Sequence, residues 1–165
     1  MQSDTPKKET VWYTGELEHE GFPLMLRFPE KPDFDSLQDR YPRLLTIEHH
    51  FAQVKSNGLP ESPYNTSLFE FDQHILGMLG DSGFPVLVET FAGKRTYYIY
   101  ITPELDAVGA IDQLRVLYPE HKIESEVRKG SGWRVIRQYS EDYSFYKKKG
   151  DPVGTDNARA APRRV

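Results

Sequence analysis

The order of predicted secondary structure between Leu44 and Arg128 limits the folds open to this chain most strongly. Residues 44–51 alternate apolar and polar side chains, as a half-buried strand does, and residues 95–101 form the most β-prone run of the chain. Two segments with apolar residues at helical spacing and two further strands complete the order strand, helix, strand, strand, helix, strand. This is the order of the ferredoxin-like split βαββαβ fold.

Right-handed crossovers would place both helices on one face of a four-stranded antiparallel sheet, with the two β-prone runs side by side in its centre. Residues 11–17 and 22–28 form an expected N-terminal β-hairpin, which either extends an edge of this sheet or covers its open face. Apolar residues at helical spacing predict a last helix over 133–143, with a strand over 133–139 as the alternative. We therefore predict an α+β fold: a ferredoxin-like antiparallel sheet with helices on one face, an N-terminal β-hairpin and a C-terminal helix.

Two local signals predict where the central helices begin. Ser67 and Glu70 have the spacing of a capping box, and the apolar stripe that follows reaches to Gly80, which can end the helix. The second helix is predicted to start at residues 102–104, where a cap residue precedes a proline and an acidic residue. Pro119 then ends this helix.

Composition and charge narrow the class of protein. The 165 residues include 21 Lys and Arg against 25 Asp and Glu, so the formal net charge is −4. The chain has no cysteine, which excludes disulfides, thiolate nucleophiles and cysteine-ligated zinc. No apolar stretch approaches the ~20 residues of a membrane helix, and residues 1–9 lack the apolar core of a secretory signal. We expect a soluble, cytoplasmic protein.

The chain is expected to fold as one domain over residues 11–146. Residues 1–10 are polar and are predicted to be disordered. Residues 147–165 carry six cations and two anions, a charge of +4 that leaves −8 on residues 1–146. This segment has no apolar periodicity, so we predict a basic disordered tail, which is either a solvated terminus or an arm that contacts RNA or an acidic partner.

The expected open face of the sheet carries the best candidate site. Glu48 and His50 share one face of their strand and would lie beside Tyr98 and Tyr100 on the neighbouring central strand. An imidazole beside a carboxylate can hold a proton near neutral pH, and phenols add hydrogen-bond donors. We take these four residues and Trp133 as a ligand- or partner-binding set. The alternative is a face that is solvated or covered by the hairpin, with the tyrosine rings packed and Trp133 sealing the core.

Other motifs carry no chemistry in this context. Residues 80–85 resemble the nucleophile loop of trypsin-like proteases, but the chain is too short for two β-barrels and turn residues account for the match. His49 and His50 are adjacent on a strand, so their side chains point to opposite faces and do not form a metal pair. The sequence has no His-Glu-x-x-His motif and no glycine-rich phosphate loop. We therefore name no catalytic residue, no metal ligand and no cofactor.

The chain resembles the bacterial domain-of-unknown-function family 695 over roughly residues 10–145. The resemblance is carried by the Trp12 strand, the Gly21-Phe22-Pro23 turn, the Tyr41-Pro42 pair before a strand, the Phe69-Glu70 helix, the strand from Arg95 to Tyr100 and the late Trp133. That family has no established activity. Such domains resemble neighbours of the ribonuclease E regulator family of the B type, which implies a regulatory binding role by association.

Three functions remain open at this point. The preferred one is a small non-enzymatic binding or regulatory module that acts through a protein partner, because the body is acidic, aromatic residues are abundant and no catalytic signature is intact. The second is a small-ligand binder or enzyme that uses Glu48, His50 and Tyr98. The third is RNA binding through the sheet and the basic tail, which the −8 body disfavours because it repels phosphate. No membrane partner is expected.

Overall fold

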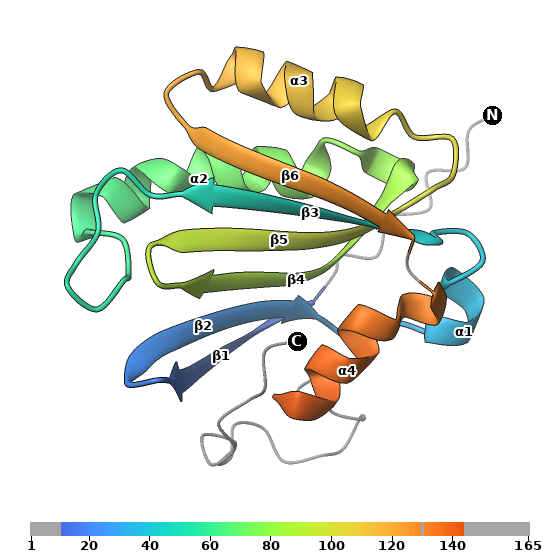
Figure 1. Ribbon diagram of the computed structural model, residues 1–165, viewed down its shortest axis with the longest axis horizontal. Coiled ribbons are helices and arrows are strands. Elements are labelled where there is room, and N and C mark those ends of the chain that lie inside the picture. The colour runs from blue at the N-terminus through green and yellow to red at the C-terminus, as the bar shows by residue number, and fades with distance from the viewer. Residues whose placement is uncertain (1–10, 130, 144–165) are drawn as a thin grey trace.

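The computed structural model describes residues 11–129 and 131–143. Six strands in this part of the chain form one antiparallel sheet in the order β1-β2-β4-β5-β3-β6 (Figure 1). The strands are β1 (Trp12–His19), β2 (Phe22–Pro29), β3 (Arg43–His50), β4 (Gly83–Phe91), β5 (Lys94–Ile101) and β6 (Lys122–Lys129). The predicted α+β class is confirmed. Our expectations for residues 1–10 and for the tail 147–165 lie outside the described residues.

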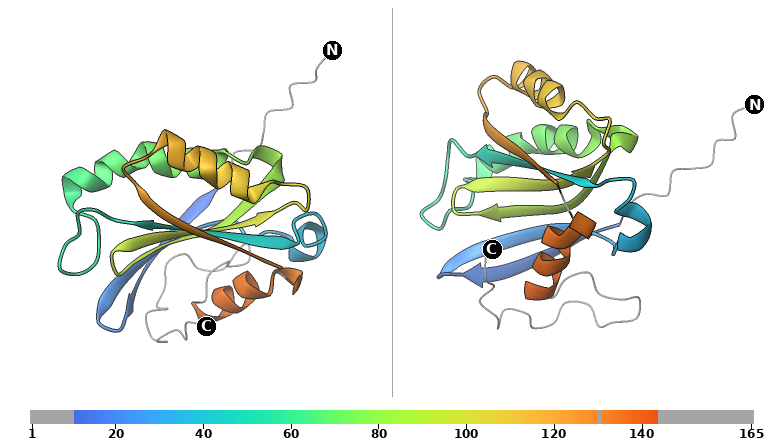
Figure 2. Two further views of the ribbon diagram at one scale, coloured as in Figure 1. Left: turned by 45° about the horizontal axis from the view of Figure 1, so that its top comes forward. Right: turned by 45° about the vertical axis from the view of Figure 1, so that its right-hand side comes forward.

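The helices lie on both faces of the sheet. They are α1 (Phe34–Leu37), α2 (Ser62–Gly77), α3 (Ala107–Leu117) and α4 (Arg134–Asp142), with short 3₁₀ turns η1 (Gly80–Ser82) and η2 (Ser131–Trp133). Helices α2 and α3 cover one face, and α4 lies against the other (Figure 2). We call these the α2/α3 face and the α4 face.

Each face of the sheet has its own apolar core. Strand alternation sends every second side chain to the α2/α3 face, where the buried residues include Leu45, Ile47, Phe71, Ile99 and Ile111. The intervening side chains supply the core of the α4 face, whose buried residues include Leu24, Leu26, Leu44, Tyr100 and Trp133. The alternation predicted for the third strand is therefore confirmed.

The N-terminal hairpin extends the sheet at one edge, which is the first of the two predicted alternatives. Strand β2 pairs with β4, while β1 forms the outer edge strand (Figure 1). The loop between β1 and β2 is the two-residue turn of Glu20 and Gly21, with φ values of 53° and 81°. Two positive φ values are typical of the type I′ turn, whose twist matches that of the flanking strands.

Both predicted helix starts are wrong by several residues. Helix α2 begins at Ser62, because Pro63 occupies the first turn, where its fixed φ and missing N–H cost nothing. Ser67 lies inside this helix and donates its hydroxyl to the carbonyl of Tyr64 instead of capping. Helix α3 begins at Ala107, because the Asp106 carboxylate accepts the backbone N–H of Gly109 at 3.0 Å.

Candidate functional site

The register between β3 and β5 divides the predicted site residues into two groups. Thr46 lies opposite Tyr98 and His50 lies opposite Lys94, so four positions of β3 separate His50 from the partner of Tyr98. Four strand positions correspond to about 13 Å. The expected single cluster of imidazole, carboxylate and phenols is therefore wrong. The adjacency of the two strands was predicted correctly, but alternation alone does not reveal which residues pair.

The first group lies under α4. Tyr98 packs against Tyr139 with ring centroids 5.9 Å apart, and Tyr100 stacks on Trp133 at 4.4 Å. The Trp133 indole N–H donates to the Tyr41 carbonyl at 2.6 Å, and both Tyr100 and Trp133 are fully buried. Burial raises the pKa of Tyr100 to about 12. Trp133 thus seals the core, as the alternative for this residue predicted, and Tyr100 presents no surface to a ligand.

The second group lies at the far end of the same face and is open to solvent. His50 Nε2 lies 3.2 Å from Glu124 Oε2 and 3.7 Å from Glu48 Oε2. The Lys94 ammonium donates to the other Glu48 oxygen, Oε1, at 3.0 Å. The side chains of Glu48 and His50 are each 32% exposed, and that of Glu124 is 60% exposed. This open polar cluster joins β3, β5 and β6.

His49 faces the opposite way, which confirms that it does not pair with His50. Its side chain is buried on the α2/α3 face. The Nε2 atom of His49 lies 2.8 Å from Nδ1 of His121, and the ring centroids of His49 and Phe71 lie 4.5 Å apart. Burial lowers the pKa of His49 to about 3, and repulsion from a proton on His121 and from the Arg95 guanidinium adds to this effect. Burial also lowers the pKa of His121. The pair is therefore neutral in the folded protein at neutral pH.

A buried carboxylate anchors α2 to the sheet. Asp72, which is 2% exposed, accepts from Arg27 Nη1 at 2.9 Å and from the Tyr97 hydroxyl at 2.9 Å. Arg95 Nη1 lies 3.5 Å from the same carboxylate. Burial and the adjacent Asp72 charge raise the pKa of Tyr97 far above its usual range. Two guanidinium groups thus share one carboxylate.

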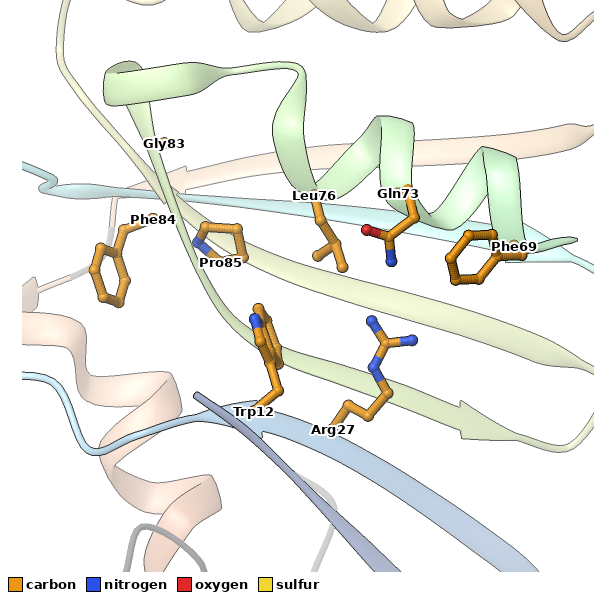
Figure 3. A pocket seen from close by; sticks show the side chains of 8 residues that line it. All are labelled: Trp12, Arg27, Phe69, Gln73, Leu76, Gly83, Phe84 and Pro85. Atoms are coloured by element: carbon orange, nitrogen blue, oxygen red, sulfur yellow. The ribbon is translucent and has the colours of Figure 1, made fainter. Parts of the chain in front are cut away.

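One side of this network opens into a groove between the N-terminal hairpin and α2. Trp12 and Arg27 point from the hairpin toward Leu76 and Gln73 of α2 (Figure 3). The groove has a volume of about 560 Å³ and is lined by Trp12, Arg27, Phe69, Gln73, Leu76, Gly83, Phe84 and Pro85. The Arg27 guanidinium lies 5.7 Å from the centre of the Trp12 ring. We call this space the hairpin groove.

Sequence reasoning missed the residues that shape the hairpin groove and part of the open polar cluster. Arg27 and Phe69 sit in segments whose secondary structure was predicted, yet nothing in one strand or helix shows that the two segments face each other. Glu124 had a usable signal, because it alternates with the apolar residues of β6 and so lies on the polar face. Lys94 had none, because its contact with Glu48 depends on the register.

Comparison with known proteins identifies a family but no function. Residues 9–139 match the family model described as "Family of unknown function (DUF695)". No curated protein and no solved structure matches the chain. Among the helices of residues 11–129 and 131–143, none combines the length and the apolar character needed to cross a membrane.

Proposed function

The chain belongs to the DUF695 family, and we propose that it is a non-enzymatic binding module whose hairpin groove holds a segment of a protein partner. The segment would carry an apolar side chain and a carboxylate. The observation that carries this proposal is the position of Arg27, which lies at an apolar groove with its guanidinium held by Asp72 and beside the Trp12 ring.

The charge of the network favours an acidic ligand. Arg27 and Arg95 together carry two positive charges, and Asp72 supplies one negative charge. The Arg27 side chain is one-third exposed, so its remaining N–H groups can reach a carboxylate in the groove. Because Asp72 already holds this guanidinium in place, little side-chain entropy is lost when a second carboxylate binds.

The shape of the groove favours a short extended segment. Phe69, Gln73 and Leu76 lie on one stripe of α2 that is about 10 Å long at the helical rise. Three residues of an extended chain span about the same length. Phe69 is 68% exposed and Trp12 closes the groove from the hairpin side, so aromatic rings lie on both walls. Aromatic rings and arginine are the residues that most often carry binding energy at interfaces.

Tryptophan fluorescence offers a direct test, because the chain has two tryptophans and Trp133 is fully buried, which leaves Trp12 to report on the groove. The probes are acetylated, amidated tripeptides that combine leucine or phenylalanine with glutamate, and the same peptides with glutamine. We expect the glutamate peptides to change the emission and the glutamine peptides to bind at least several-fold more weakly.

Phe69→Glu should weaken the binding of the glutamate peptides, because it places a negative charge at the groove. Val116→Glu is the matched control, since Val116 is an exposed aliphatic residue of α3 (79% exposed) that does not line the groove. Peptides that leave the emission unchanged at millimolar concentration, or that bind the Phe69→Glu variant as well as the original chain, would contradict the proposal.

The two alternative functions have less support. RNA binding through the sheet needs exposed aromatic rings on the central strands, whereas Tyr100 is buried and Tyr98 packs against Tyr139. An enzyme built on Glu48, His50 and Tyr98 needs all three groups together, whereas the register separates Tyr98 from His50. A ferredoxin-like arrangement of residues 43–129 is also part of our proposal, and the strand order β4-β5-β3-β6 with α2 and α3 on one face supports it.

A further inference from the structure

The open polar cluster contains two carboxylates that face each other across two strands. Glu48 of β3 pairs directly with Glu124 of β6, and like charges in directly opposite positions destabilise a sheet. His50 lies two residues beyond Glu48 on the same face, and its Nε2 lies within reach of both carboxylates. Lys94 compensates only one of the two, through Glu48 Oε1. Lys122 lies opposite His50 on β6, so a lysine flanks the cluster on each side, and one oxygen of each carboxylate still faces the same imidazole nitrogen.

The spacing of these atoms matches the edge of a metal coordination shell. Ligand bonds of about 2.0–2.2 Å in a tetrahedral site place neighbouring ligand atoms roughly 3.3–3.6 Å apart. The two distances from His50 Nε2, 3.2 Å to Glu124 Oε2 and 3.7 Å to Glu48 Oε2, lie close to this spacing. One ligand atom from each of the three residues lies within 4.8 Å of the others.

We propose that Glu48, His50 and Glu124 bind a divalent transition-metal ion on the uncovered part of the α4 face. One imidazole and two carboxylates suit zinc or manganese, whereas magnesium and calcium prefer oxygen ligands alone. Three protein ligands leave at least one position for water or another ligand, whereas structural zinc sites are closed by four protein ligands. Lys94 holds Glu48 Oε1 and so orients Oε2 toward the ion, which is the role of an outer-shell partner.

The proposal is independent of the proposed function, because the cluster and the hairpin groove lie on opposite faces of the sheet. The surrounding strands also hold the proposed metal ligands rigidly. Glu48 and His50 belong to β3, which pairs on both sides, and Glu124 belongs to β6, whose eight residues all pair with β3. Ligands on paired strands are held more precisely than ligands on loops.

Calorimetric titration of the full chain with ZnCl₂ tests the proposal. We expect one equivalent of Zn²⁺ to bind, and His50→Ala and Glu124→Gln each to weaken binding on the order of 100-fold, since even outer-shell changes cost 10–100-fold. Glu126→Gln is the matched control, because Glu126 is the next carboxylate on the same face of β6 and pairs with Arg128. His74→Ala controls for the loss of a histidine on α2.

Two further measurements distinguish Zn²⁺ binding at His50 from metal binding elsewhere on the chain. Addition of Zn²⁺ should shift the imidazole NMR signals of His50 and leave those of His49 and His121 in place. MgCl₂ and CaCl₂ should produce no comparable heat. The proposal is overturned if the chain binds no Zn²⁺ at millimolar concentration, if the His50→Ala variant binds it as well as the original chain, or if Glu126→Gln weakens binding as much as Glu124→Gln. Thermal unfolding of each variant without metal verifies that it is folded.

Discussion

His49 and His50 are consecutive residues of β3, and the structure gives them opposite surroundings. His49 is 1% exposed and contacts Phe71 and His121 beneath α2 and α3. His50 is about one-third exposed and faces the carboxylates of Glu48 and Glu124. The same side chain is therefore forced to be neutral on one face and placed beside negative charge on the other. Strand alternation alone creates this difference, because successive side chains leave the sheet in opposite directions.

Two carboxylates, one on each face, differ in the same way as these histidines. Asp72 is buried with three partners, whereas Glu124 is 60% exposed. Buried ionic groups are costly to leave unpaired, while exposed pairs contribute little to stability. Buried polar residues such as Asp72 should therefore affect folding, whereas the exposed residues of the open polar cluster should affect ligand binding. Three measurements test this contrast, beginning with the largest expected effect.

Asp72→Ala should cause the largest loss of stability, about 3–5 kcal/mol, because it leaves the buried Tyr97 hydroxyl and the Arg95 guanidinium without their carboxylate. The free energy of unfolding in urea measures the loss. Glu70→Ala is the control on the exposed side of the same helix and should change stability by less than about 0.5 kcal/mol. A loss below about 1 kcal/mol for Asp72→Ala would mean that the network is not an anchor.

The stability of the unmodified chain should fall on acidification below about pH 6.5. The folded-state pKa of His49 is lowered to about 3, so between these values the unfolded chain binds a proton that folded His49 does not. Stability is fully present above the unfolded pKa of about 6.5 and is lost as the pH drops toward 3. His49 then contributes roughly 1.4 kcal/mol per pH unit, or about 2 kcal/mol between pH 7 and pH 5.

Urea unfolding at pH 7, 6 and 5 measures this dependence, and two adjacent substitutions sharpen it. His49→Gln should make the free energy of unfolding fall less steeply on acidification, because it removes one of the two histidines that burial keeps neutral. In His50→Gln the contribution of His49 to the slope should persist, since His49 stays buried against Phe71 and His121. Equal slopes for His49→Gln and the original chain would show that another group causes the pH dependence.

Glu124→Gln should have the smallest effect on folding. Without metal, it removes the like-charge pair with Glu48, while the amide oxygen of glutamine can still accept from His50 Nε2, so it should raise the free energy of unfolding by a few tenths of a kcal/mol. With ZnCl₂ present, the original chain should instead be more stable than Glu124→Gln, because bound metal stabilises only the chain that retains its ligands. Thermal unfolding with and without ZnCl₂ measures both effects. A variant that is less stable than the original chain without metal would contradict the like-charge argument.

Much of the fold could be predicted because its signals are local. The alternation of residues 44–51, the β-prone run at 95–101 and the hairpin turn at Gly21 each depend on neighbours in sequence. The helix starts were missed because competing start signals were present: Pro63 in the first turn of α2 and the Asp106 cap of α3 prevailed over Ser67 and Thr102. The candidate site was predicted less accurately, because its residues are brought together by contacts between segments far apart in the chain.

By itself, the sequence determined which side chains share a face of each strand, since that depends only on alternation along the backbone. It thereby placed Glu48 with His50 and separated both from His49. Only the tertiary structure decided that His50 lies opposite Lys94, that α4 covers Tyr98 and that Arg27 faces α2. These outcomes depend on register and on the packing of distant segments, whose free energies involve contacts that no single stretch of sequence contains.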